Sequence, residues 1–297
     1  MAERMKLGAK VPSSGPVPRS HGIGSMASDL EDAGFQSLWC SDHVVMPQHV
    51  ESLYPFSDDG SVTWDLKMPW YDAVVALSCM QEATTTAEIG VAVLVLALRH
   101  PLTFAKQAAS IDALSEGRLA IGVGAGWLSE EFEALGVDFD SRGPRMDSYL
   151  ELMRHAWSGS VGPSDDEYHH LPAAVWTHPT PARPVPILIG GMSAAALRRT
   201  ARLGDGWLAL QRADELDAQA MASAIGALRE HCASEERDPS SVRVVLRVIE
   251  SAGRSEVVAA QLKDLWAAGV TEVVVDTSWD GDGDADVTAE RLRNALD

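Results

Sequence analysis

Short apolar stretches alternate with amphipathic helical stretches eight times along this chain of 297 residues. Strands that are apolar on both faces are typical of parallel sheets covered by helices, and a strand–helix–strand unit forms a right-handed crossover. Eight such units match the count of an α/β TIM (β/α)8 barrel, which we expect to occupy residues 1–297 as a single domain. Strands are predicted at residues 7–11, 37–40, 89–98, a run ending at 127, 185–189, 206–210, 242–249 and 272–276. Helices are predicted at residues 23–33, 71–81, 103–114, about 145–157, 194–203, 216–235, 256–268 and about 287–296.

Three segments lack strand or helix periodicity and are predicted to be insertions. They cover about residues 44–70 after strand two, 128–143 after strand four, and 158–184 before strand five. Long insertions after strands are usually functional or mobile. The third contains His169, His170 and His178 without further ligands at metal-binding spacing, so it predicts a surface hairpin and no metal site.

Glycines recur at every second position in Gly122, Gly124 and Gly126. If this run is a strand, all three glycines lie on one face. Two interpretations are open: a crowded barrel interior without room for side chains, or a flat ligand that approaches the backbone closely. A dinucleotide fingerprint is rejected because it requires a further glycine where Trp127 stands.

The charge balance excludes several partners. With 24 basic and 43 acidic residues, the net charge is −19, which repels nucleic acid and anionic membranes. Any anionic ligand must therefore be bound by local arginines or helix N-termini. Three distant cysteines, no signal peptide and no transmembrane run predict a reduced, cytoplasmic location.

Polar residues cluster where the predicted strands end, which is where TIM barrels place their chemistry. After strand two, His43 is a candidate acid or base, with Asp42 orienting it, whereas Cys40 is expected in the core. After strand five, Gly190 and Gly191 precede Ser193, a predicted helix N-cap whose exposed amides suit an anion. The aspartates at positions 280, 282, 284 and 286 lack the closing glutamate of a calcium loop and predict a solvated acidic loop.

The order and spacing of ten short motifs resemble the luciferase-like monooxygenase family over roughly residues 5 to 280. Within that family, the pattern is most similar to the actinobacterial branch that uses coenzyme F420, a deazaflavin. The motifs are GFQSLW at 34–39, SDH at 41–43, RHP at 99–101, SEGRL at 115–119, GVGAGW at 122–127, EEF at 130–132, LGV at 135–137, RG at 142–143, ILIGG at 187–191 and GDGW at 204–207.

The resemblance implies an oxidoreductase, usually a homodimer, that transfers hydride between the deazaflavin and a small organic substrate. It implies that Asp42 and His43 lie beside the ring and that a cis peptide joins Ala92 to Val93 behind it. The cofactor-binding residues that it implies are Ala92, Val93, Gly124, Gly126, Trp127, Gly190, Gly191 and Met192, of which the last three hold the phosphate-bearing tail. The tryptophans Trp39, Trp64, Trp70 and Trp127 are candidates for an apolar pocket that excludes water, with core packing as the preferred interpretation of Trp39.

Departures from the branch argue against a sugar-phosphate substrate. Its sugar-phosphate dehydrogenases carry Trp where this chain has Pro47, and a Glu acid where it has Trp127. Their phosphate-binding Thr and Lys correspond to Leu210 and Ala213, with Arg212 as a candidate substitute. Two other functions fit the same resemblance: a monooxygenase that uses reduced FMN and dioxygen, or a paralogue that binds the cofactor without catalysis.

Overall fold

The computed structural model describes residues 4–280 and 284–297. Eight parallel strands close into a barrel in the order β1-β12-β11-β10-β9-β4-β3-β2, which confirms the predicted TIM barrel. The strands are β1 Lys6–Lys10, β2 Ser37–Cys40, β3 Glu88–Val95, β4 Leu119–Gly124, β9 Ile187–Gly190, β10 Gly206–Arg212, β11 Arg243–Ile249 and β12 Glu272–Val275.

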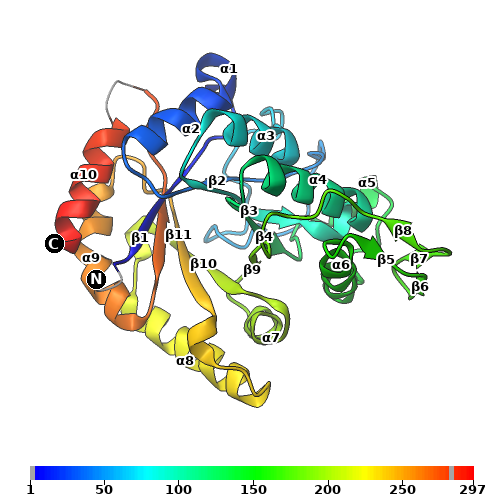
Figure 1. Ribbon diagram of the computed structural model, residues 1–297. Helices are drawn as coiled ribbons and strands as arrows, with labels where there is room; N and C mark the ends of the chain where they lie inside the picture. The colour runs from blue at the N-terminus through cyan, green and yellow to red at the C-terminus, as the bar shows by residue number, and fades with distance from the viewer. Residues whose placement is uncertain (1–3, 281–283) are drawn as a thin grey trace.

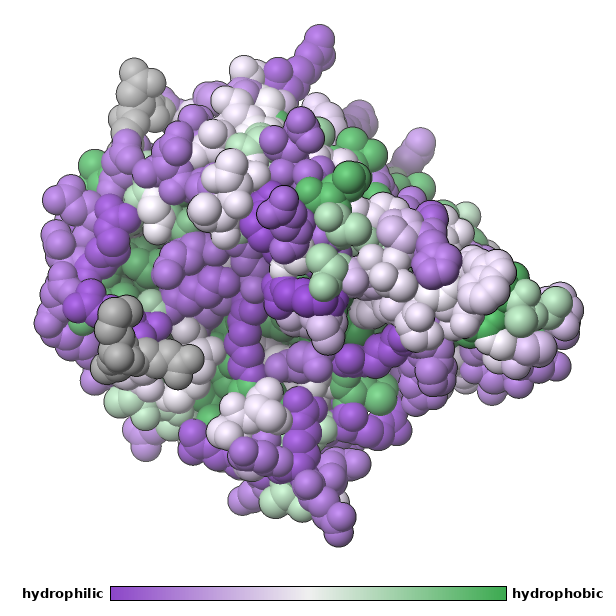
Figure 2. All heavy atoms as spheres, in the orientation of Figure 1, coloured by the Kyte–Doolittle hydropathy of each residue, from purple (hydrophilic) through white to green (hydrophobic). Residues whose placement is uncertain are grey.

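Helices surround the barrel, and both termini lie on the side formed by α9 and α10 (Figure 1). The α-helices are α1 Val17–His21, α2 Ile23–Asp32, α3 Ala73–Ala83, α4 Pro101–Leu114, α5 Ser129–Ala134, α6 Arg142–Ala156, α7 Ala194–Leu203, α8 Ala218–Ser234, α9 Ser255–Ala268 and α10 Asp284–Leu296. Short 3-10 helices are η1 Leu96–Leu98, η2 Ala213–Glu215 and η3 Pro239–Ser241. Hydrophilic residues cover most of the face in Figure 2, with apolar residues in patches between them.

The strand ends differ from the prediction at two central positions. Strand β3 ends at Val95, and the last three residues of the predicted run form η1. Strand β4 ends at Gly124, and Gly126 has φ +86°, a left-handed conformation that glycine adopts freely. The prediction that three glycines share one strand face was therefore wrong for Gly126.

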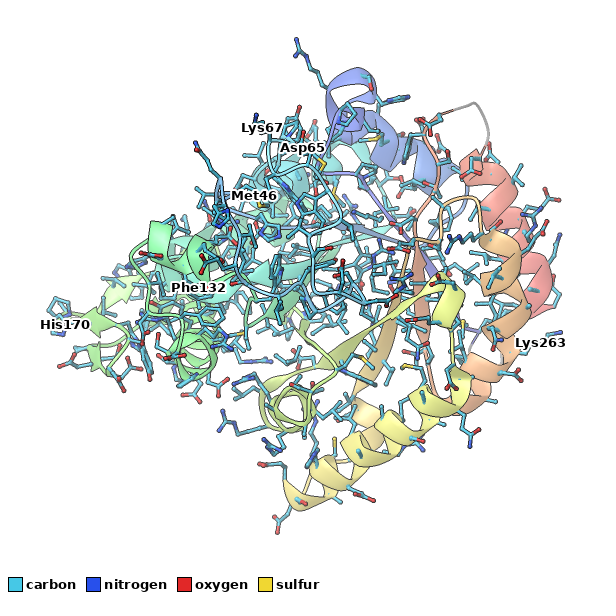
Figure 3. The ribbon with its side chains drawn as sticks, turned by 180° about the vertical axis from the view of Figure 1, so that it is seen from behind. Met46, Asp65, Lys67, Phe132, His170 and Lys263 are labelled. Carbon is cyan, nitrogen blue, oxygen red and sulfur yellow. The ribbon has the colours of Figure 1, made fainter. Side chains whose placement is uncertain are left out.

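The predicted insertions differ in their structure. Residues 44–69 contain no helix or strand, and all of them are described. The segment at 128–143 instead holds α5 and the start of α6. The segment at 158–184 forms two antiparallel ribbons, in line with the predicted surface hairpin: β5 Ser160–Val161 pairs with β8 Val175–Trp176, and β6 Ser164–Asp165 with β7 His170–Leu171. Figure 3 places His170 at the outer end of these ribbons, and Lys263 on the opposite side of the molecule.

The predicted acidic loop was wrong in part. Asp284 and Asp286 lie in the first turn of α10 rather than in a loop, where carboxylates interact favourably with the helix dipole. Asp282 lies outside the described residues.

The barrel interior is apolar at its centre and charged at one side of its mouth. Because strand side chains alternate between the two faces, Arg247 lies two residues beyond the inward Val245, and Asp276 two residues beyond the inward Val274. Lys10 follows Gly8, which faces Val274, by the same spacing. The central apolar layer consists of Trp39, Ala120, Leu188, Leu208, Val245 and Val274.

Candidate active site

A cavity of about 1440 Å³ opens where the strands end at their carboxyl termini. Single drug-sized ligands occupy pockets of about 300–1000 Å³, so this cavity has room for a cofactor and a substrate together. Its wall includes every residue that the sequence predicted for catalysis or cofactor binding. Those residues are Asp42, His43, Ala92, Val93, Gly124, Gly126, Trp127, Gly190, Gly191 and Met192.

His43 is held by a buried carboxylate. Its Nδ1 lies 2.9 Å from Oε2 of Glu131, and the two side chains are 9% and 1% exposed. The other carboxylate oxygen, Oε1, accepts hydrogen bonds from the backbone N–H groups of Val44 at 2.6 Å and Val45 at 3.1 Å. Because the carboxylate accepts, we assign the ring proton to Nδ1 of His43. Nε2 is then the ring nitrogen that remains for a ligand in the cavity.

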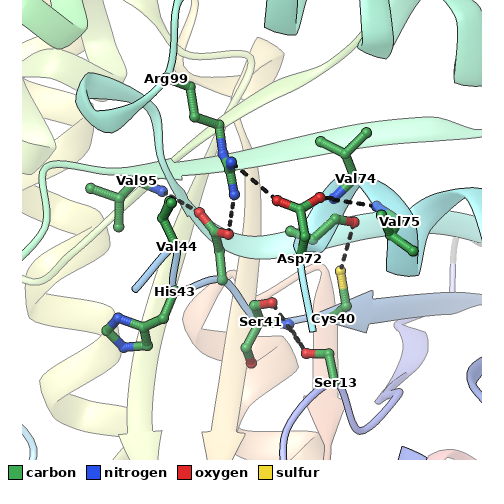
Figure 4. Close-up of polar contacts among 12 residues, drawn as sticks. Ser13, Cys40, Ser41, His43, Val44, Asp72, Val74, Val75, Val95 and Arg99 are labelled. Atoms are coloured by element: carbon green, nitrogen blue, oxygen red, sulfur yellow. Dashed lines mark hydrogen bonds and ion pairs between the residues drawn. The ribbon is translucent and has the colours of Figure 1, made fainter. Parts of the chain in front are cut away.

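The prediction that Asp42 orients His43 was wrong. The Asp42 carboxylate accepts hydrogen bonds from Arg99 and, at 3.1 Å, from the N–H of Val95. In Figure 4 no dashed line reaches the His43 ring, which lies away from Arg99. Burial raises the pKa of Asp42, although Arg99 beside it acts in the opposite direction. Consecutive residues leave a strand toward opposite faces, so Asp42 instead ties the end of β2 to the end of β3.

Glu131 is a candidate functional residue that the sequence did not predict. It lies on α5, directly after the end of β4. A carboxylate following one strand and a histidine following another meet at the same end of a barrel. The EEF motif at 130–132 contains this carboxylate, but its segment was interpreted as an acidic insertion. The contact between Glu131 and His43, 88 residues apart, was therefore not predicted.

Aromatic rings surround His43. Its ring centroid lies 4.6 Å from that of Trp70 and 6.3 Å from those of Trp64 and Trp127, as predicted for these three tryptophans. Tyr54 closes the group at 5.2 Å from Trp127. The indole N–H groups of Trp64 and Trp70 are buried and have no hydrogen-bond partner within the described part of the chain. Because an unsatisfied buried donor is costly, these two groups fit a ligand oxygen.

Trp39 lies in the core, as predicted. It is 1% exposed, and its Nε1 donates to Ser37 at 3.0 Å and to Glu272 at 3.2 Å. Cys40 is buried as well, and burial raises the pKa of its thiol above the ordinary value. Both predictions of a core role are confirmed.

Glycines on β4 and β9 make room for one valine. A Cβ atom on Gly124 would lie 2.7 Å from Cγ2 of Val93, and one on Gly190 would lie 2.5 Å from its Cγ1. The peptide bond from Ala92 to Val93 is cis, as the family resemblance implied. At these positions the barrel interior is crowded, as one of the two interpretations expected, and Val93 itself faces the cavity. We call Val93, Gly124 and Gly190 the glycine side.

The start of α7 provides backbone donors beside the glycine side. Ser193 is its N-cap, as predicted, and accepts a hydrogen bond from the N–H of Ala196 at 3.2 Å. Gly191 has φ +119°, a backbone conformation that side chains rarely adopt. Met192 is 42% exposed, and its sulfur accepts from the N–H of Leu210 at 3.4 Å.

Three charged residues line the opposite side of the mouth, on neighbouring strands. Arg247 on β11 pairs with Asp276, directly after β12, and also donates to the carbonyl of Val248 at 2.7 Å. Burial alone would raise the pKa of Asp276, but Arg247 and Lys10 hold it below its ordinary value. Lys10 ends β1. We call Lys10, Arg247 and Asp276 the charged side.

The segment at 44–70 covers the cavity and is fastened to α5. Glu130 accepts hydrogen bonds from the N–H groups of Glu51 at 2.5 Å and Ser52 at 2.9 Å, and from the Ser52 hydroxyl at 2.7 Å. Although burial acts in the opposite direction, these hydrogen bonds lower the pKa of Glu130 to about 2. The carboxylate is therefore an acceptor at neutral pH.

The sequence model of a protein family described as "Luciferase-like monooxygenase" matches residues 5–295 of this chain. An uncharacterized protein of Mycobacterium tuberculosis is 36% identical over 183 residues, which is 62% of this chain and 63% of that protein, so this chain spans less than two thirds of that relative. A second uncharacterized protein from that organism is 28% identical and covers 90% of each chain. The F420-dependent glucose-6-phosphate dehydrogenase of Gordonia bronchialis is 29% identical over 70% of this chain and 57% of its own.

Solved structures share the fold at low identity. An F420-dependent secondary alcohol dehydrogenase in complex with an F420-acetone adduct has a TM-score of 0.78 at 16% identity, over 99% of this chain and 100% of its own. The long-chain alkane monooxygenase LadA has a TM-score of 0.75 at 16% identity, over 100% and 92%. No helix in the described part of the chain is long and apolar enough to cross a membrane. The match over residues 5–295 shows that the chain belongs to the luciferase-like monooxygenase family, whose members are typically oxidoreductases.

Proposed function

We propose that this protein is a coenzyme F420-dependent oxidoreductase that transfers hydride between the deazaflavin and a small organic substrate. The observation that carries the proposal is His43, which Glu131 holds at Nδ1 so that Nε2 remains for a ligand among three tryptophans. Named relatives at 28–29% identity that depend on F420 support the choice of cofactor.

The residues present fit a ring system with an anionic tail. The orphaned indole N–H groups of Trp64 and Trp70 are suited to carbonyl oxygens of a bound ligand. By resemblance, Ala92, Val93, Gly124, Gly126 and Trp127 would flank the ring. In the same way Gly190, Gly191 and Met192 would hold the tail at the start of α7, where exposed amides favour an anion. The deazaflavin supplies the hydride transfer when it is bound.

His43 would move the proton that accompanies the hydride. When a substrate alcohol is oxidised, Nε2 of His43 accepts the hydroxyl proton, and Glu131 stabilises the resulting imidazolium through Nδ1–H. When a carbonyl is reduced, the same atom donates the proton. Trp64, Trp70 and Trp127 exclude water from this exchange, which strengthens the electrostatic interaction between Glu131 and His43.

The structure argues against a sugar phosphate as the substrate. Arg212, the candidate phosphate ligand, pairs with Asp214 at 3.1 Å and lies 3.6 Å from Glu250. Ala213, which stands where the sugar-phosphate dehydrogenases have a phosphate-binding Lys, is fully buried and carries no charge. A phosphate would have to displace two carboxylates from Arg212, at a cost in charge pairing.

A cofactor titration tests the proposal most directly. The deazaflavin and FMN are added separately to the cofactor-free protein, and quenching of tryptophan fluorescence gives each Kd. Tighter binding of the deazaflavin is expected. Tighter binding of FMN would support the flavin monooxygenase instead, and deazaflavin binding without turnover of any alcohol, aldehyde or enone would support a non-catalytic paralogue.

Replacing His43 tests the mechanism. His43→Ala should lower turnover by about 10²–10⁴-fold, the usual contribution of a general acid or base, and leave the deazaflavin Kd within a few-fold. His49→Ala removes an 85% exposed histidine from the same segment and serves as the matched control. Unchanged turnover in His43→Ala would remove His43 from the mechanism.

We extend the proposal to a cytoplasmic homodimer. The cysteines Cys40, Cys79 and Cys232 are all free, which suits a reducing compartment. Val75, in the first turn of α3, and Leu114, at the end of α4, are exposed apolar side chains (58% and 71%) on neighbouring helices, and each suits a contact with a second copy. Light scattering after size-exclusion chromatography measures the assembly, and a monomer at micromolar concentration would refute the dimer.

A further inference from the structure

Lys10, on the charged side of the cavity, is a cation without a close carboxylate partner in the part of the chain that the structure describes. It ends β1, next to Trp39 in the register of β1 with β2, and its side chain lines the cavity. In the described residues 4–280 and 284–297, its ammonium group makes no ion pair within 4.0 Å and no hydrogen bond. The titratable groups that act on it at longer range are Asp276, Arg247 and Cys40. Partial burial lowers the pKa of Lys10, as expected for a charge that is partly removed from water.

The other cations of the cavity wall already have partners. Arg247 pairs with Asp276, Arg199 with Asp147, and Arg212 with Asp214. Arg142 lies over the ring of Phe139, 3.8 Å from its centroid. Lys10 is thus the cation of the cavity wall that has neither an ion pair nor an aromatic partner within the described residues.

The charged side carries a net charge of +1 when Lys10 is protonated, from two cations and one carboxylate. Lys10 is half-buried, and a charge that is partly removed from water without a counterion is costly. Groups perturbed in this way are candidates for functional sites. A ligand with one negative charge would neutralise the net charge of the charged side. A phosphate dianion would leave an excess negative charge beside Asp276, whereas a carboxylate balances the site.

Lys10 and His43 lie at the ends of neighbouring strands and line the same cavity. Lys10 pairs in register with Trp39 on β2, and His43 follows Trp39 by four residues on the same strand end. Tyr54, which packs on Trp127, provides an aromatic wall along the same cavity. A substrate with its reacting oxygen at His43 therefore has aromatic surfaces beside it and an ammonium group at the neighbouring strand end.

We infer that the cavity selects substrates that carry a single carboxylate on an apolar or aromatic body, and that Lys10 receives that carboxylate. This inference rests on the proposed oxidoreductase function and names its class of substrate. Such a carboxylate would supply the counterion that Lys10 lacks among residues 4–280 and 284–297.

Benzoate and benzamide test the inference, because they share shape and differ in charge. Each is titrated calorimetrically into the protein saturated with oxidised deazaflavin and into the cofactor-free protein. The wild-type protein should bind benzoate about tenfold more tightly than benzamide. Equal affinity for the two would overturn the inference, and tighter binding of phenyl phosphate than of benzoate would overturn the assignment to a carboxylate.

Three variants test whether Lys10 causes the preference for benzoate over benzamide. Lys10→Met should bind benzoate no more tightly than benzamide, whereas Lys263→Met, which removes an exposed lysine from α9 on the outside of the molecule (Figure 3), should keep the wild-type preference. Asp276→Asn raises the charge of the site by one and should tighten benzoate binding several-fold with no change for benzamide. A preference that persists in Lys10→Met, or is lost in Lys263→Met, would overturn the inference.

The two proposals fail separately. If the deazaflavin does not bind, the proposed function is overturned, while a Lys10-dependent benzoate preference in the cofactor-free protein still supports the anion site. If the deazaflavin binds and no preference is found, only the substrate inference is overturned.

Discussion

The two sides of the barrel mouth differ in what their strand ends place in the cavity: glycines beside a valine on one side, and charged side chains on the other. On the glycine side, Gly124 and Gly190 remove side chains so that Val93 fits between two strands at van der Waals distance. On the charged side, Arg247 and Asp276 project full side chains from the equivalent strand ends into the cavity. A barrel cannot present bulky residues from every strand at one level, because its interior holds only a few side chains per layer.

The comparison indicates that separate strands determine the shape of the cavity wall and its charge. The glycine side, on β3, β4 and β9, forms a tightly packed apolar surface against which a flat ring can lie. The charged side, on β1, β11 and β12, is less well compensated, since Lys10 has no close counterion in the described residues. Substitutions on the two sides should therefore change stability in different ways.

The largest effect is expected from Asp276→Ala, which leaves the 7% exposed Arg247 without its carboxylate. Breaking a buried pair from one side costs about 3–5 kcal/mol, and urea unfolding at pH 7 measures it. Asp214→Ala is the control, because its pair with Arg212 is exposed and such pairs contribute about 0–1 kcal/mol.

The loss from Asp276→Ala should depend on pH in a defined direction. The folded-state pKa of Asp276 is lowered, so its stabilisation is present above the unfolded-state pKa of about 3.9 and is lost as the pH falls through the folded-state value. The difference between wild type and variant should therefore shrink below about pH 4. A difference that stays constant down to pH 2 would contradict this account of the charged side.

A smaller loss is expected from Gly190→Ala on the glycine side. The new Cβ atom would lie 2.5 Å from Cγ1 of Val93, so the valine must move toward the cavity. Overpacking of this kind costs about 1–3 kcal/mol, and the displaced valine should also weaken deazaflavin binding. Thermal unfolding and the fluorescence titration measure the two effects.

Two further variants show whether packing causes the loss in Gly190→Ala. Adding Val93→Ala to Gly190→Ala should restore much of the stability, because the smaller side chain leaves the space free. Gly226→Ala, in α8 with nothing within 4 Å of its new Cβ atom, should instead gain about 0.5–1 kcal/mol. No recovery in the double variant would show that Val93 is not the obstacle.

Periodicity was enough to predict the barrel, because apolar alternation reports which faces are buried. All eight barrel strands lie where the apolar stretches predicted them, and α7 has the predicted bounds. The end of β4 was misplaced because Gly126 continues the glycine spacing in sequence but turns out of the strand. Local pattern cannot distinguish a glycine that extends a strand from one that leaves it.

The site was predictable where it depends on single strand ends, and not where it depends on pairs across the barrel. His43 was identified from its position after β2, and the tryptophans from their side-chain chemistry. The partner of His43 was assigned to its sequence neighbour Asp42, whereas the structure brings Glu131 to it. Lys10 was not identified from the sequence because a lysine at the end of a short strand normally reaches solvent, whereas the closed barrel partly buries this one.

Removing the unpaired charge should stabilise the protein modestly. The folded-state pKa of Lys10 is lowered by burial, so the unfolded chain holds this proton more tightly than the folded one, and the bound proton favours unfolding. Lys10→Met should therefore raise the Tm at pH 7 by about 2 °C or more. The gain should diminish as the pH rises toward 10.5, where the unfolded chain also loses the proton. Lys263→Met, with an exposed side chain, should leave the Tm unchanged, and a lower Tm for Lys10→Met would show that the charge is satisfied in the fold.

The smallest effect on global stability is expected from Glu130→Ala, which removes the acceptor that fastens residues 51 and 52 to α5 above both sides of the mouth. Since the segment at 44–70 has no helix or strand of its own, its order depends on such contacts, and its amides should exchange with solvent about tenfold faster. Hydrogen exchange at pH 7 measures this, with the exposed Glu133→Ala on the same helix as the control. Because the pKa of Glu130 is about 2, wild-type protection corrected for intrinsic exchange should stay the same between pH 7 and pH 4. If protection in this segment is unchanged in Glu130→Ala, the tryptophans hold the cover in place by packing alone, and both sides of the mouth are shielded independently of α5.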